Sequence, residues 1–415
     1  MKILHLNYYD SKGGAAIAVN RIHESLILNG VDSKILVSEK NTTNSRIIGP
    51  LSTFDQIVSL LKISFQRKLI KINPQKEAFS RSFNLLSSNI LNKINTLNPD
   101  LVHLHWIGNE MISIKQISRI NKPIVWTLHD MWPYCATEHY TFSKKYAEGY
   151  DKEFNKFFLN FDKYAWKLKK KYLKKEIFFV PTSEWQKKNL EESILFKDNP
   201  NKLIPLPLDL NFWKPIDKNI SKKILGLPED KKIILLGGDQ IIKRKWKGFD
   251  VIKDILSNEK NQFFRDEIFY LFFGDDKEML PNLKNLNIKY KYFDHVAPNS
   301  YDIKLLYSAS DVLLIPSYLE SFGQIALEAL SCGTPSVCFD KTGVTEVVQH
   351  LKTGYVAKNN DREDFEKGIF WCLDFSNKKN LYDECIKLAK NKFSYDLISE
   401  EYIKIYKSLI RNNQY

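Results

Sequence analysis

The sequence predicts an α/β protein made of two domains, each a doubly wound parallel sheet with helices on both faces. The chain has 415 residues, about twice the length of an ordinary single-core domain. Short β-rich runs alternate with helix-length segments, which is the pattern of βαβ units. A proline-rich stretch over residues 203–215 interrupts this alternation, which indicates a boundary between two domains.

The first half, residues 1–206, contains five runs that we predict to be strands. They cover Ile3–Asn7, Lys34–Val37, Leu101–His105, Ile124–Leu128 and Ile177–Val180. A glycine-containing loop follows the first strand, and a helix is expected from about Ala15 to Asn29, ended by Gly30. Helix-length segments between strands favour parallel pairing, so this half should form its own sheet.

The second half, residues 207–394, repeats the pattern with five more predicted strands. They cover Lys232–Leu236, Phe269–Phe273, Ile288–Phe293, Val312–Ile315 and Ser336–Phe339. A helical apolar pattern from about Tyr395 to Ile410 fills the last segment, residues 395–415, which we expect to pack back toward the first domain. In sheets of this kind ligands bind at the carboxyl ends of the strands, so the loops after the strands should carry the function.

Composition limits the possible environments and partners. The five cysteines form no C-x-x-C pair, which favours a reducing compartment over a disulfide framework or a zinc site. The N-terminal residues lack the pattern of a secretory signal, and we find no apolar run long enough to span a membrane. We therefore expect a cytoplasmic protein, which could also lie on the inner face of the plasma membrane as a peripheral protein.

A formal net charge of +13 suits an anionic partner. No zinc-finger or RNP motif is found, so nucleic acid is not expected. Basic residues are densest over Lys163–Lys175, where Trp166 and Tyr172 are interleaved with lysines. On a helix this segment could lie on anionic lipid, and it could equally be a solvated helix face.

The segment Pro316–Pro335 carries the most information. It follows the apolar strand Val312–Ile315 and has the features of a helix start: Ser321 is predicted to be the N-cap, with Gln324 completing a capping box. We expect the helix to begin at Phe322, and Gly323 would let a ligand approach the backbone closely. The N–H groups at such a helix start favour an anion, so this segment predicts a diphosphate site.

Two carboxylates flank the predicted helix start. Glu320 precedes it and Glu328 lies about two turns inside, so about 12 Å separates them along the helix axis. One of them could bind a sugar on one side of a diphosphate, while the other accepts hydrogen bonds from ribose hydroxyls on the far side. The alternative is two unrelated glutamates, and the strand that precedes them argues against it.

With its E-x7-E spacing, the segment resembles the corresponding region of the retaining glycosyltransferases of family 4 (the group 1 type), which have the GT-B fold of two Rossmann-like domains. The family also has glycines after the first strand, matched by Gly13 and Gly14, and an Arg/Lys pair after the first strand of the second domain. Lys247 matches the lysine of that pair. Arg244 is the candidate arginine, and Lys243 or Lys245 could replace it.

The resemblance implies a role for each matching residue. The first domain would bind the acceptor and the second the nucleotide sugar, through Gly13, Gly14, Arg244, Lys247, Ser321, Phe322, Gly323 and Glu328. A second segment, Trp126–Tyr134, resembles the T-x-H-D-x-W-P stretch of polysaccharide-building members. It places His129 beside the reacting sugar and Asp130 next to it, where Asp130 could orient His129 or contact the acceptor. His129, Asp130 and Glu320 are therefore the catalytic candidates.

The function predicted on this basis is retaining transfer of a sugar from a nucleoside-diphosphate sugar to a hydroxyl of a glycan, lipid-linked, in cell-surface polysaccharide synthesis. No metal and no other cofactor is expected, because cationic side chains and helix N–H groups would stabilise the leaving diphosphate. Two alternatives stay open: a nucleotide-sugar 2-epimerase of the same fold, and a non-catalytic basic protein that binds membrane.

Overall fold

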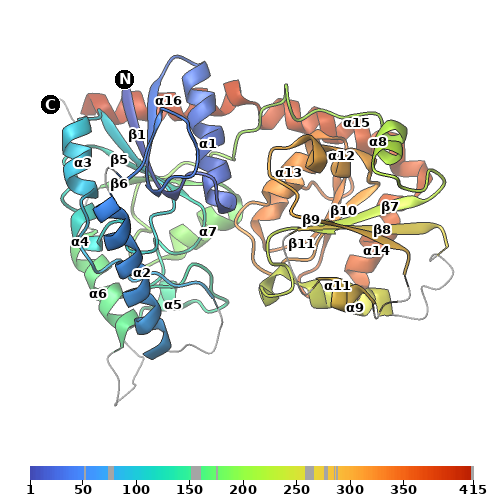
Figure 1. The fold of residues 1–415 in the computed structure, drawn as a ribbon, viewed down its shortest axis with the longest axis horizontal. Coiled ribbons are helices and arrows are strands. Elements are labelled where there is room, and N and C mark those ends of the chain that lie inside the picture. The colour runs from blue at the N-terminus through green and yellow to red at the C-terminus, as the bar shows by residue number, and fades with distance from the viewer. Residues whose placement is uncertain are drawn as a thin grey trace. The chain divides into compact units, whose positions relative to one another are not determined.

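The fold is that of a computed structural model, in which contacts divide the chain into two compact units (Figure 1). Unit 1 comprises Met1–Pro207 and Asp396–Tyr415, and unit 2 comprises Leu208–Tyr395. The structure describes residues 1–50, 53–72, 79–150, 160–173, 176–257, 266–274, 279–284, 286 and 288–412.

Unit 1 contains a six-stranded parallel sheet with the order β3-β2-β1-β4-β5-β6. The strands are β1 (Lys2–Tyr9), β2 (Asp32–Glu39), β3 (Ile47–Ile48), β4 (Leu101–Leu104), β5 (Ile124–Leu128) and β6 (Ile177–Pro181). The five predicted strands are confirmed, with β1 and β2 longer than expected. The sequence pattern missed β3, because two residues are too few to show an alternation.

Unit 1 also contains several helices. They are α1 (Gly13–Leu28), α2 (Thr53–Ile72), α3 (Ile90–Leu97), α4 (Ile114–Ile117), α5 (Lys145–Glu148), α6 (Phe161–Tyr172), α7 (Glu184–Glu192) and α16 (Tyr395–Asn412). Helix α1 starts two residues before its predicted start. Helix α16 contributes Tyr402 and Tyr406 to the interior, where both side chains are fully buried.

Unit 2 contains a second six-stranded parallel sheet with the order β12-β11-β10-β7-β8-β9. The strands are β7 (Lys232–Gly237), β8 (Ile268–Gly274), β9 (Tyr290–Asp294), β10 (Val312–Ile315), β11 (Ser336–Phe339) and β12 (Gly354–Ala357). The five predicted strands are confirmed, and β12 is an additional edge strand. The helices are α8 (Lys218–Ile224), η1 (Lys245–Lys247), α9 (Phe249–Ser257), α11 (Met279–Lys284), α12 (Tyr301–Ala309), α13 (Gln324–Ser331), η3 (Gly343–Glu346), α14 (Arg362–Leu373) and α15 (Phe375–Lys392).

Both sheets are doubly wound, and their strand orders locate the ligand sites. In unit 1 the order reverses between β1 and β4, and in unit 2 between β7 and β10. Ligands of open α/β sheets bind at the carboxyl ends of the strands at such a reversal. The central strands β4, β5, β10 and β11 are buried along their whole length, as expected for strands covered on both faces.

Helix α6 corrects one expectation about the basic segment Lys163–Lys175. Trp166 is buried, and Lys169 is buried too, donating hydrogen bonds to the carbonyl oxygens of Trp132 and Cys135. These two side chains therefore belong to the interior and not to an outer basic aromatic face. Lys167, Lys170 and Lys171 are exposed, while residues 174–175 lie outside the described residues. Among the helices in the described part of the chain, none is long and apolar enough to cross a membrane.

Candidate active site

The loops after β7 and β10 pack directly against each other at the switch point of unit 2. The backbone N–H of Tyr318 donates to the carbonyl oxygen of Trp246 over 2.8 Å. Gly248 follows η1 with φ of 73°, and a Cβ at this position would overlap the carbonyl oxygen of Pro316. Only glycine combines this left-handed conformation with so close an approach. The contact fixes the position of Lys247, the preceding residue, relative to the end of β10.

Lys247 and Glu320, predicted separately, form an ion pair. The Lys247 Nζ lies 2.5 Å from the Glu320 Oε2, and both side chains are partly exposed. One residue comes from the loop after β7 and the other from the loop after β10, at the strand-order reversal. The pair therefore places a cation and a carboxylate at the point where this fold binds ligands.

The predicted capping box at the start of α13 is wrong. The helix begins at Gln324 rather than Phe322, and Gly323 occupies the N-cap position with φ of 89°, in the left-handed region. Ser321 therefore lies two residues before the N-cap position. Glycine offers no side-chain oxygen to the N–H groups of the first turn. A helix start of this kind is therefore better suited to an external acceptor, such as an anion, than a helix start with a serine N-cap.

A second glycine loop supports the segment from Glu320 to Gly323. The N–H of Gly343, the first residue of η3, donates to the carbonyl oxygen of Glu320 over 2.7 Å. A Cβ on Gly343 would overlap the backbone of Ser321, and Val344 packs beside Gly323. The sequence pattern did not single out Gly343 as a support of the helix start, because only the folded chain brings the loop after β11 against the loop after β10.

The other unit 2 candidates have partners of their own. Glu328 is buried within α13, where its Oε2 accepts a 2.8 Å hydrogen bond from the Tyr307 hydroxyl. Arg244 pairs with Asp239 at 3.0 Å and does not join the Lys247–Glu320 pair. Lys243 and Lys245 are exposed. Phe322 is buried and makes an edge contact with the ring of Phe393. Phe322 therefore packs inside unit 2, and any role at the ligand would involve its backbone.

In unit 1, His129 follows the end of β5 and terminates a chain of hydrogen-bonded histidines. Its Nε2 lies 2.9 Å from the Nδ1 of His105, and the Nε2 of His105 lies 2.9 Å from the Nδ1 of His5. Burial lowers the pKa of His129 to about 4, although the carboxylate of Asp130 acts in the opposite direction. His129 is therefore neutral near pH 7 and acts as a hydrogen-bonding group rather than a cation.

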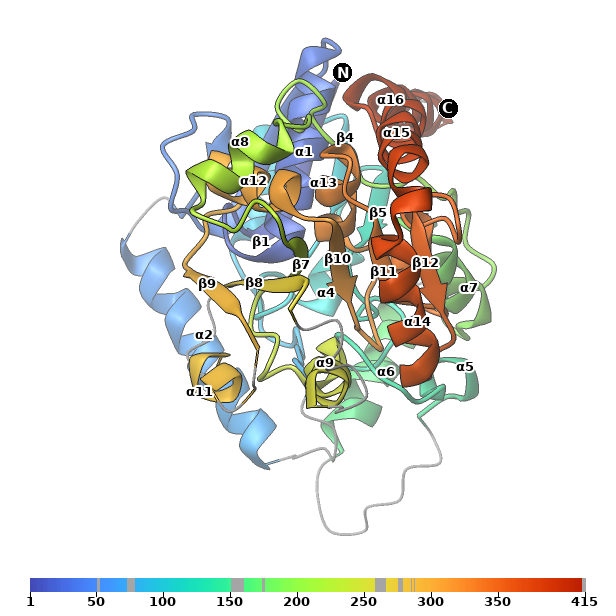
Figure 2. The ribbon, with the colours of Figure 1, turned by 90° about the vertical axis from the view of Figure 1, so that its right-hand side faces the viewer.

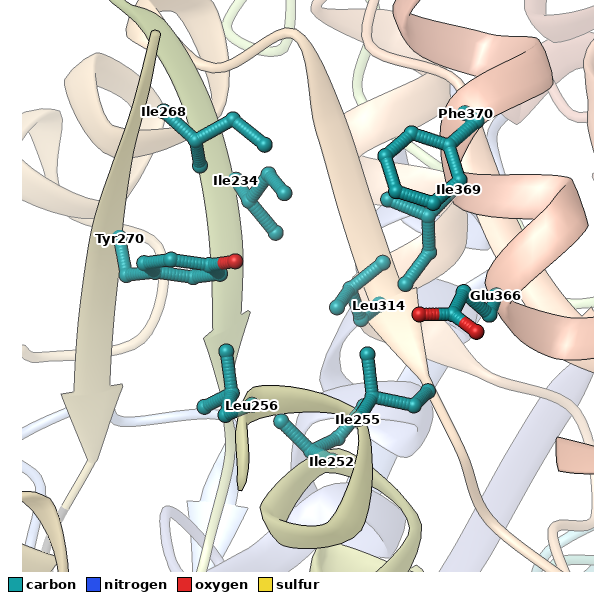
Figure 3. Close-up of a pocket in the computed structure, with 10 residues that line it drawn as sticks. All are labelled: Ile234, Ile252, Ile255, Leu256, Ile268, Tyr270, Leu314, Glu366, Ile369 and Phe370. Atoms are coloured by element: carbon teal, nitrogen blue, oxygen red, sulfur yellow. The ribbon is translucent and has the colours of Figure 1, made fainter. Parts of the chain in front are cut away.

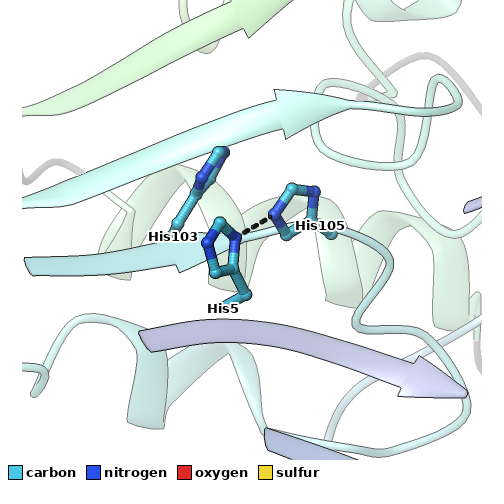
Figure 4. A group of neighbouring side chains, drawn as sticks. All are labelled: His5, His103 and His105. Atoms are coloured by element: carbon cyan, nitrogen blue, oxygen red, sulfur yellow. Dashed lines mark hydrogen bonds between the residues drawn. The ribbon is translucent and has the colours of Figure 1, made fainter. Parts of the chain in front are cut away.

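Two rings of this chain, His5 and His105, come close to a third ring, that of His103, inside the sheet (Figure 4). His5 on β1 and His103 and His105 from β4 and its end lie with ligand atoms within 4.8 Å of one another. His103 already bonds the Thr127 hydroxyl and the Tyr406 hydroxyl, each at 2.7 Å. Burial holds the pKa of all three rings well below the usual range. His103 and His105 thus have a hydrogen-bond partner at each ring nitrogen, whereas the Nε2 of His5 is buried without a partner among the described residues.

Asp130 does not orient His129. Its Oδ2 lies 2.5 Å from the Nδ1 of His139, and its Oδ1 accepts a 2.9 Å bond from the backbone N–H of Trp132. The indole of Trp106 also reaches His139, over 3.1 Å. Asp130 therefore organises the loop that follows β5. Sequence reasoning missed His139, which lies nine positions away and becomes a neighbour only through the turn of that loop.

Gly13 and Gly14 form the first turn of α1, directly after the loop that follows β1. Gly13 has φ of 80°, and a Cβ there would meet nothing within 4 Å. The left-handed φ is what favours glycine at this position, and the space where a Cβ would stand is open. The first helical turn again directs N–H groups toward the end of β1.

An apolar pocket elsewhere in unit 2 contains none of the predicted site residues (Figure 3). It lies between the sheet and helices α9 and α14. Its lining is mostly aliphatic and aromatic: Ile234, Ile252, Ile255, Leu256, Ile268, Tyr270, Leu314, Glu366, Ile369 and Phe370. A diphosphate needs cations or N–H groups, so this pocket is not the donor site.

Two family descriptions match the chain, one for each half. Residues 12–212 match Glycosyltransferase Family 4, and residues 217–392 match Glycosyl transferases group 1. A glycosyltransferase of Methanocaldococcus jannaschii with no assigned activity is 26% identical over 231 residues, which are 53% of this chain and 58% of that protein. N-acetyl-alpha-D-glucosaminyl L-malate synthase of Bacillus anthracis is 27% identical over 203 residues, 46% of this chain and 50% of that protein. The chain thus spans about half the length of the curated relatives it matches.

Solved structures of similar fold match the chain over nearly its whole length. A sucrose-phosphate synthase from Thermosynechococcus elongatus gives a TM-score of 0.69 at 17% identity, covering 99% of both chains. The Anabaena protein HepE in complex with UDP and glucose gives 0.67 at 16% identity, covering 99% of this chain and 100% of that one. At such identities the similarity establishes the fold, which is GT-B, with its two Rossmann-like halves.

Proposed function

This chain belongs to the group 1 glycosyltransferases, and from that premise we propose that it moves a sugar from a nucleoside-diphosphate sugar to a hydroxyl group. The observation that carries the proposal is the Lys247–Glu320 pair next to the glycine-capped start of α13. The ion pair and the helix start together bring a cation, a carboxylate and a helix N-terminus to the point where the strand order of unit 2 reverses. Relatives of the same fold have been solved with UDP and with UDP-glucose, which supports a nucleotide sugar as donor.

The donor's diphosphate would lie at the start of α13. There the Lys247 ammonium and the N–H groups of the first helical turn would balance the charge that grows on the leaving diphosphate. When a phosphate takes up the Lys247 ammonium, Glu320 is released from its ion pair and can accept hydrogen bonds from the transferred sugar. Glu328 would bind the ribose hydroxyls, in exchange for its present bond from Tyr307.

In unit 1, His129 would bind the transferred sugar as a neutral ring. The lowered pKa keeps it uncharged, so it can donate or accept one hydrogen bond without adding a cation beside the developing positive charge of the sugar. Gly13 and Gly14 would allow a close approach to the first turn of α1. Asp130 would act through the loop it organises rather than through contact with the sugar.

We propose retention of configuration at the anomeric carbon. The acceptor oxygen would attack on the face that the diphosphate leaves, and a donor phosphate oxygen would take the acceptor's proton. The bond from the anomeric carbon to the diphosphate oxygen breaks as the new glycosidic bond forms, and the products are the glycoside and a nucleoside diphosphate. The resemblance of Trp126–Tyr134 to polysaccharide-building members suggests a growing glycan, carried on a lipid, as acceptor.

A panel of nucleoside-diphosphate sugars, offered with lipid-linked acceptors, tests the proposal. Release of nucleoside diphosphate that depends on the acceptor, and an anomeric configuration in the product equal to that of the donor by NMR, would support it. Thermal shifts with UDP, GDP and ADP identify the base. Free monosaccharide formed without an acceptor would point to the epimerase instead, and no release with any donor would overturn the assignment.

A further inference from the structure

The hydrogen-bonded histidines of unit 1 follow a diagonal across three neighbouring strands, β1, β4 and β5 (Figure 2). His5 on β1 pairs in register with His103 on β4, and His105 stands two residues beyond His103. The register between β4 and β5 places His129 a further two residues along, directly after β5. The chain of rings therefore leads from the interior of the sheet to the carboxyl ends of its strands, where ligands of this fold bind.

The two ends of this chain of rings have different surroundings. His5 is fully buried, and its Nε2 has no hydrogen-bond partner among the described residues. His105, in the middle, uses both ring nitrogens, one toward each neighbour. His129 is only partly buried, and within the described part of the sequence its Nδ1 makes no hydrogen bond. The Nδ1 of His129 is therefore the nitrogen that is left for a ligand.

Because the rings are neutral, the position of one proton sets the positions of the others. Burial keeps the pKa of His5 and His105 well below the usual range and lowers the pKa of His129 to about 4, so each ring carries one N–H near pH 7. Each 2.9 Å contact between two nitrogens needs one donor and one acceptor. If the Nδ1 of His105 carries the proton, it donates to His129, and His105 accepts through Nε2 from His5. With the proton on the Nε2 of His105, both hydrogen bonds run the other way.

The buried end favours one of these two arrangements. In the first, the Nε2 of His5 is a bare nitrogen, whereas in the second it is an N–H group buried without an acceptor. Native proteins leave a buried N–H group without an acceptor less often than they leave an acceptor without a donor. Among the described residues no carboxylate bonds these three rings, and that of Asp130 bonds His139 instead. The hydrogen bonds should therefore run from His5 through His105 to His129.

We propose that His5 and His105 are positioning residues that fix His129 with its proton on Nδ1, so that His129 donates a hydrogen bond to a hydroxyl oxygen of the transferred sugar. A hydroxyl that accepts this bond keeps its own proton for a carboxylate or phosphate oxygen, so its orientation is set. A histidine that exchanged its tautomer freely would fit two hydroxyl orientations equally well. The contact with the sugar rests on the proposed function, whereas the tautomer is a property of the protein without ligand.

Nitrogen-15 NMR of the full chain without ligand tests the tautomer directly. The sequence has eight histidines, so a sample labelled at histidine gives a small set of ring signals, and those of His129 are identified by their loss in His129→Gln. At about pH 7.5 the Nδ1 of His129 should show the chemical shift of a protonated ring nitrogen, and its Nε2 that of a bare one. Reversed shifts, or averaged shifts at both nitrogens, would overturn the proposal.

Replacement of His5 tests its part in fixing the tautomer. His5→Phe keeps a ring but removes the donor to His105, so the shifts of the two His129 nitrogens should move toward each other as both tautomers become populated. His5→Asn, whose amide N–H can take the place of Nδ1–H, should return the shifts toward the parent values. His23→Phe is the matched control, because His23 is another buried histidine of unit 1 and its Nδ1 bonds Ser33.

Unchanged shifts of His129 in His5→Phe, or equal changes in His5→Phe and His23→Phe, would remove His5 from the mechanism. The spectrum of the parent protein decides on the tautomer even where His5→Phe does not fold. The two readings together separate a positioning role from a merely structural one, since loss of packing alone would not reverse with the smaller Asn side chain.

Kinetics separates this proposal from the proposed function. With the best donor of the panel, the kcat of His5→Phe should fall by about fivefold, the effect of one misdirected hydrogen bond, while that of His23→Phe stays within about twofold. The affinity for UDP, GDP or ADP, whichever gives the largest thermal shift, should be the same in both variants, since the nucleotide is assigned to unit 2. A parent-like kcat in His5→Phe with altered His129 shifts would overturn the role at the sugar. Absence of transfer by the parent protein would refute the proposed function and the sugar contact, and the tautomer would still be decided by the NMR spectrum.

Discussion

At the scale of single residues, the proposed donor site would depend on the exchange of one ion pair for another. Lys247 and Glu320 neutralise each other over 2.5 Å, so neither charge is left alone at the start of α13. A partly exposed pair of this kind contributes little to stability. Both side chains can therefore change partners at small cost, which suits a site that must admit a phosphate next to a carboxylate.

Replacement of Lys247 by alanine tests this exchange. We expect kcat/KM to fall by about 10²- to 10³-fold, because the leaving diphosphate loses a preorganised cation. The free energy of unfolding should change by less than about 1 kcal/mol, since the pair is partly exposed. Steady-state kinetics with the best donor of the panel measures the first quantity, and urea denaturation the second.

Lys253→Ala is the matched control for this variant. Lys253 is exposed on α9 and carries the same charge in the same unit. Its kcat/KM should stay within about twofold of the parent, because a charge on the solvated face of a helix is screened at physiological salt. A similar loss in both variants would mean that the net charge of unit 2, and not the position of Lys247, is responsible.

The buried histidines predict how stability depends on pH. Burial lowers the pKa of His23 and of His129 to about 4, from an ordinary value of 6.5 in the unfolded chain. Between these two values the unfolded state binds more protons, so stability falls as the pH falls from about 6.5 to about 4. Each histidine adds up to about 1.4 kcal/mol per pH unit in that window and nothing above it.

Urea midpoints measured at about pH 7.5, 6 and 5 check this slope. In His23→Asn the urea midpoint should fall less between about pH 6 and pH 5 than in the parent, because one of the titrating rings is absent. The carboxyl of Asp10, whose pKa is lowered by its hydrogen bonds, acts in the same direction but at lower pH. Midpoints that do not change between about pH 7 and pH 5 would contradict the burial of uncharged histidines in unit 1.

Individual site residues differed in how well the sequence could predict them. Lys247, Glu320 and His129 stand in motifs with characteristic spacing, so a linear pattern contained them. The partners His105 and His139 do not belong to such a motif, because each reaches the candidate site through strand pairing or a loop turn. His103 on β4 and His105 directly after its end are two residues apart, a spacing that places alternate side chains of an extended chain on one face, and that signal was available in the sequence.

At the scale of elements, the start of α13 shows why a correct motif can give a wrong geometry. The order Ser321, Phe322, Gly323, Gln324 satisfies the capping-box pattern, but Gly323 adopts a left-handed conformation and becomes the N-cap itself. The reason lies outside the helix: Gly343 and Val344 pack against this segment and hold it. Tertiary packing thus overrode a local preference, and no single-segment pattern contains that contact.

Gly343→Ala tests the importance of that support. The added Cβ would overlap the backbone of Ser321, so either η3 or the helix start must move. We expect unit 2 to lose about 1–3 kcal/mol and the affinity for the nucleoside diphosphate to fall by about tenfold or more. Calorimetric titration and thermal unfolding measure the two effects.

Gly30→Ala provides the comparison. Gly30 also has a positive φ, of 77°, but a Cβ there would meet nothing within 4 Å, and it lies after α1 away from the candidate site. Backbone strain alone should cost about 1 kcal/mol and leave nucleotide affinity unchanged. If Gly343→Ala bound nucleotide as tightly as Gly30→Ala does, the contact with Ser321 would have no role in the site.

Helices α2 and α6 show the same limit for surfaces. Composition singled out α6, but its Trp166 and Lys169 are buried and only part of its charge is exposed. Helix α2 packs Ile63 and Leu69 inward but leaves five other large apolar side chains exposed: Ile57, Leu60, Leu61, Phe65 and Ile72. A periodic pattern predicts two unlike faces and does not say which face meets the core, since the polar anchors at Ser59 and Gln66 are long-range contacts.

At the scale of the whole molecule, the strands, their parallel pairing and the two-sheet architecture were predictable, because they rest on alternation and on connection lengths. The edge strands β3 and β12 were not, because they are short and carry little pattern. The last segment of the chain is of special interest at this scale. Helix α16 follows unit 2 in sequence, but residues from Asp396 onward belong to unit 1.

This crossing makes unit 1 discontinuous, and α16 contributes to its polar interior. The Tyr402 hydroxyl lies 3.0 Å from the Thr127 hydroxyl, and the Tyr406 hydroxyl lies 2.7 Å from the Nδ1 of His103. Both tyrosines are fully buried, and Ile398 and Ile405 are buried beside them. Without α16, polar groups and apolar surface of the sheet would be uncovered together, which costs several kilocalories per mole.

A fragment of residues 1–207 should therefore unfold at a much lower temperature than the same fragment carrying residues 395–412 on a long glycine-serine linker. A linked version with Tyr402→Ala and Tyr406→Ala separates specific packing from the mere presence of a helix, and it should behave like the unlinked fragment. Residues 208–394, which are continuous in sequence, should unfold cooperatively on their own. Equal unfolding temperatures for 1–207 with and without the added helix would show that unit 1 is complete before α16, and that the burial of the two tyrosines adds nothing to its stability.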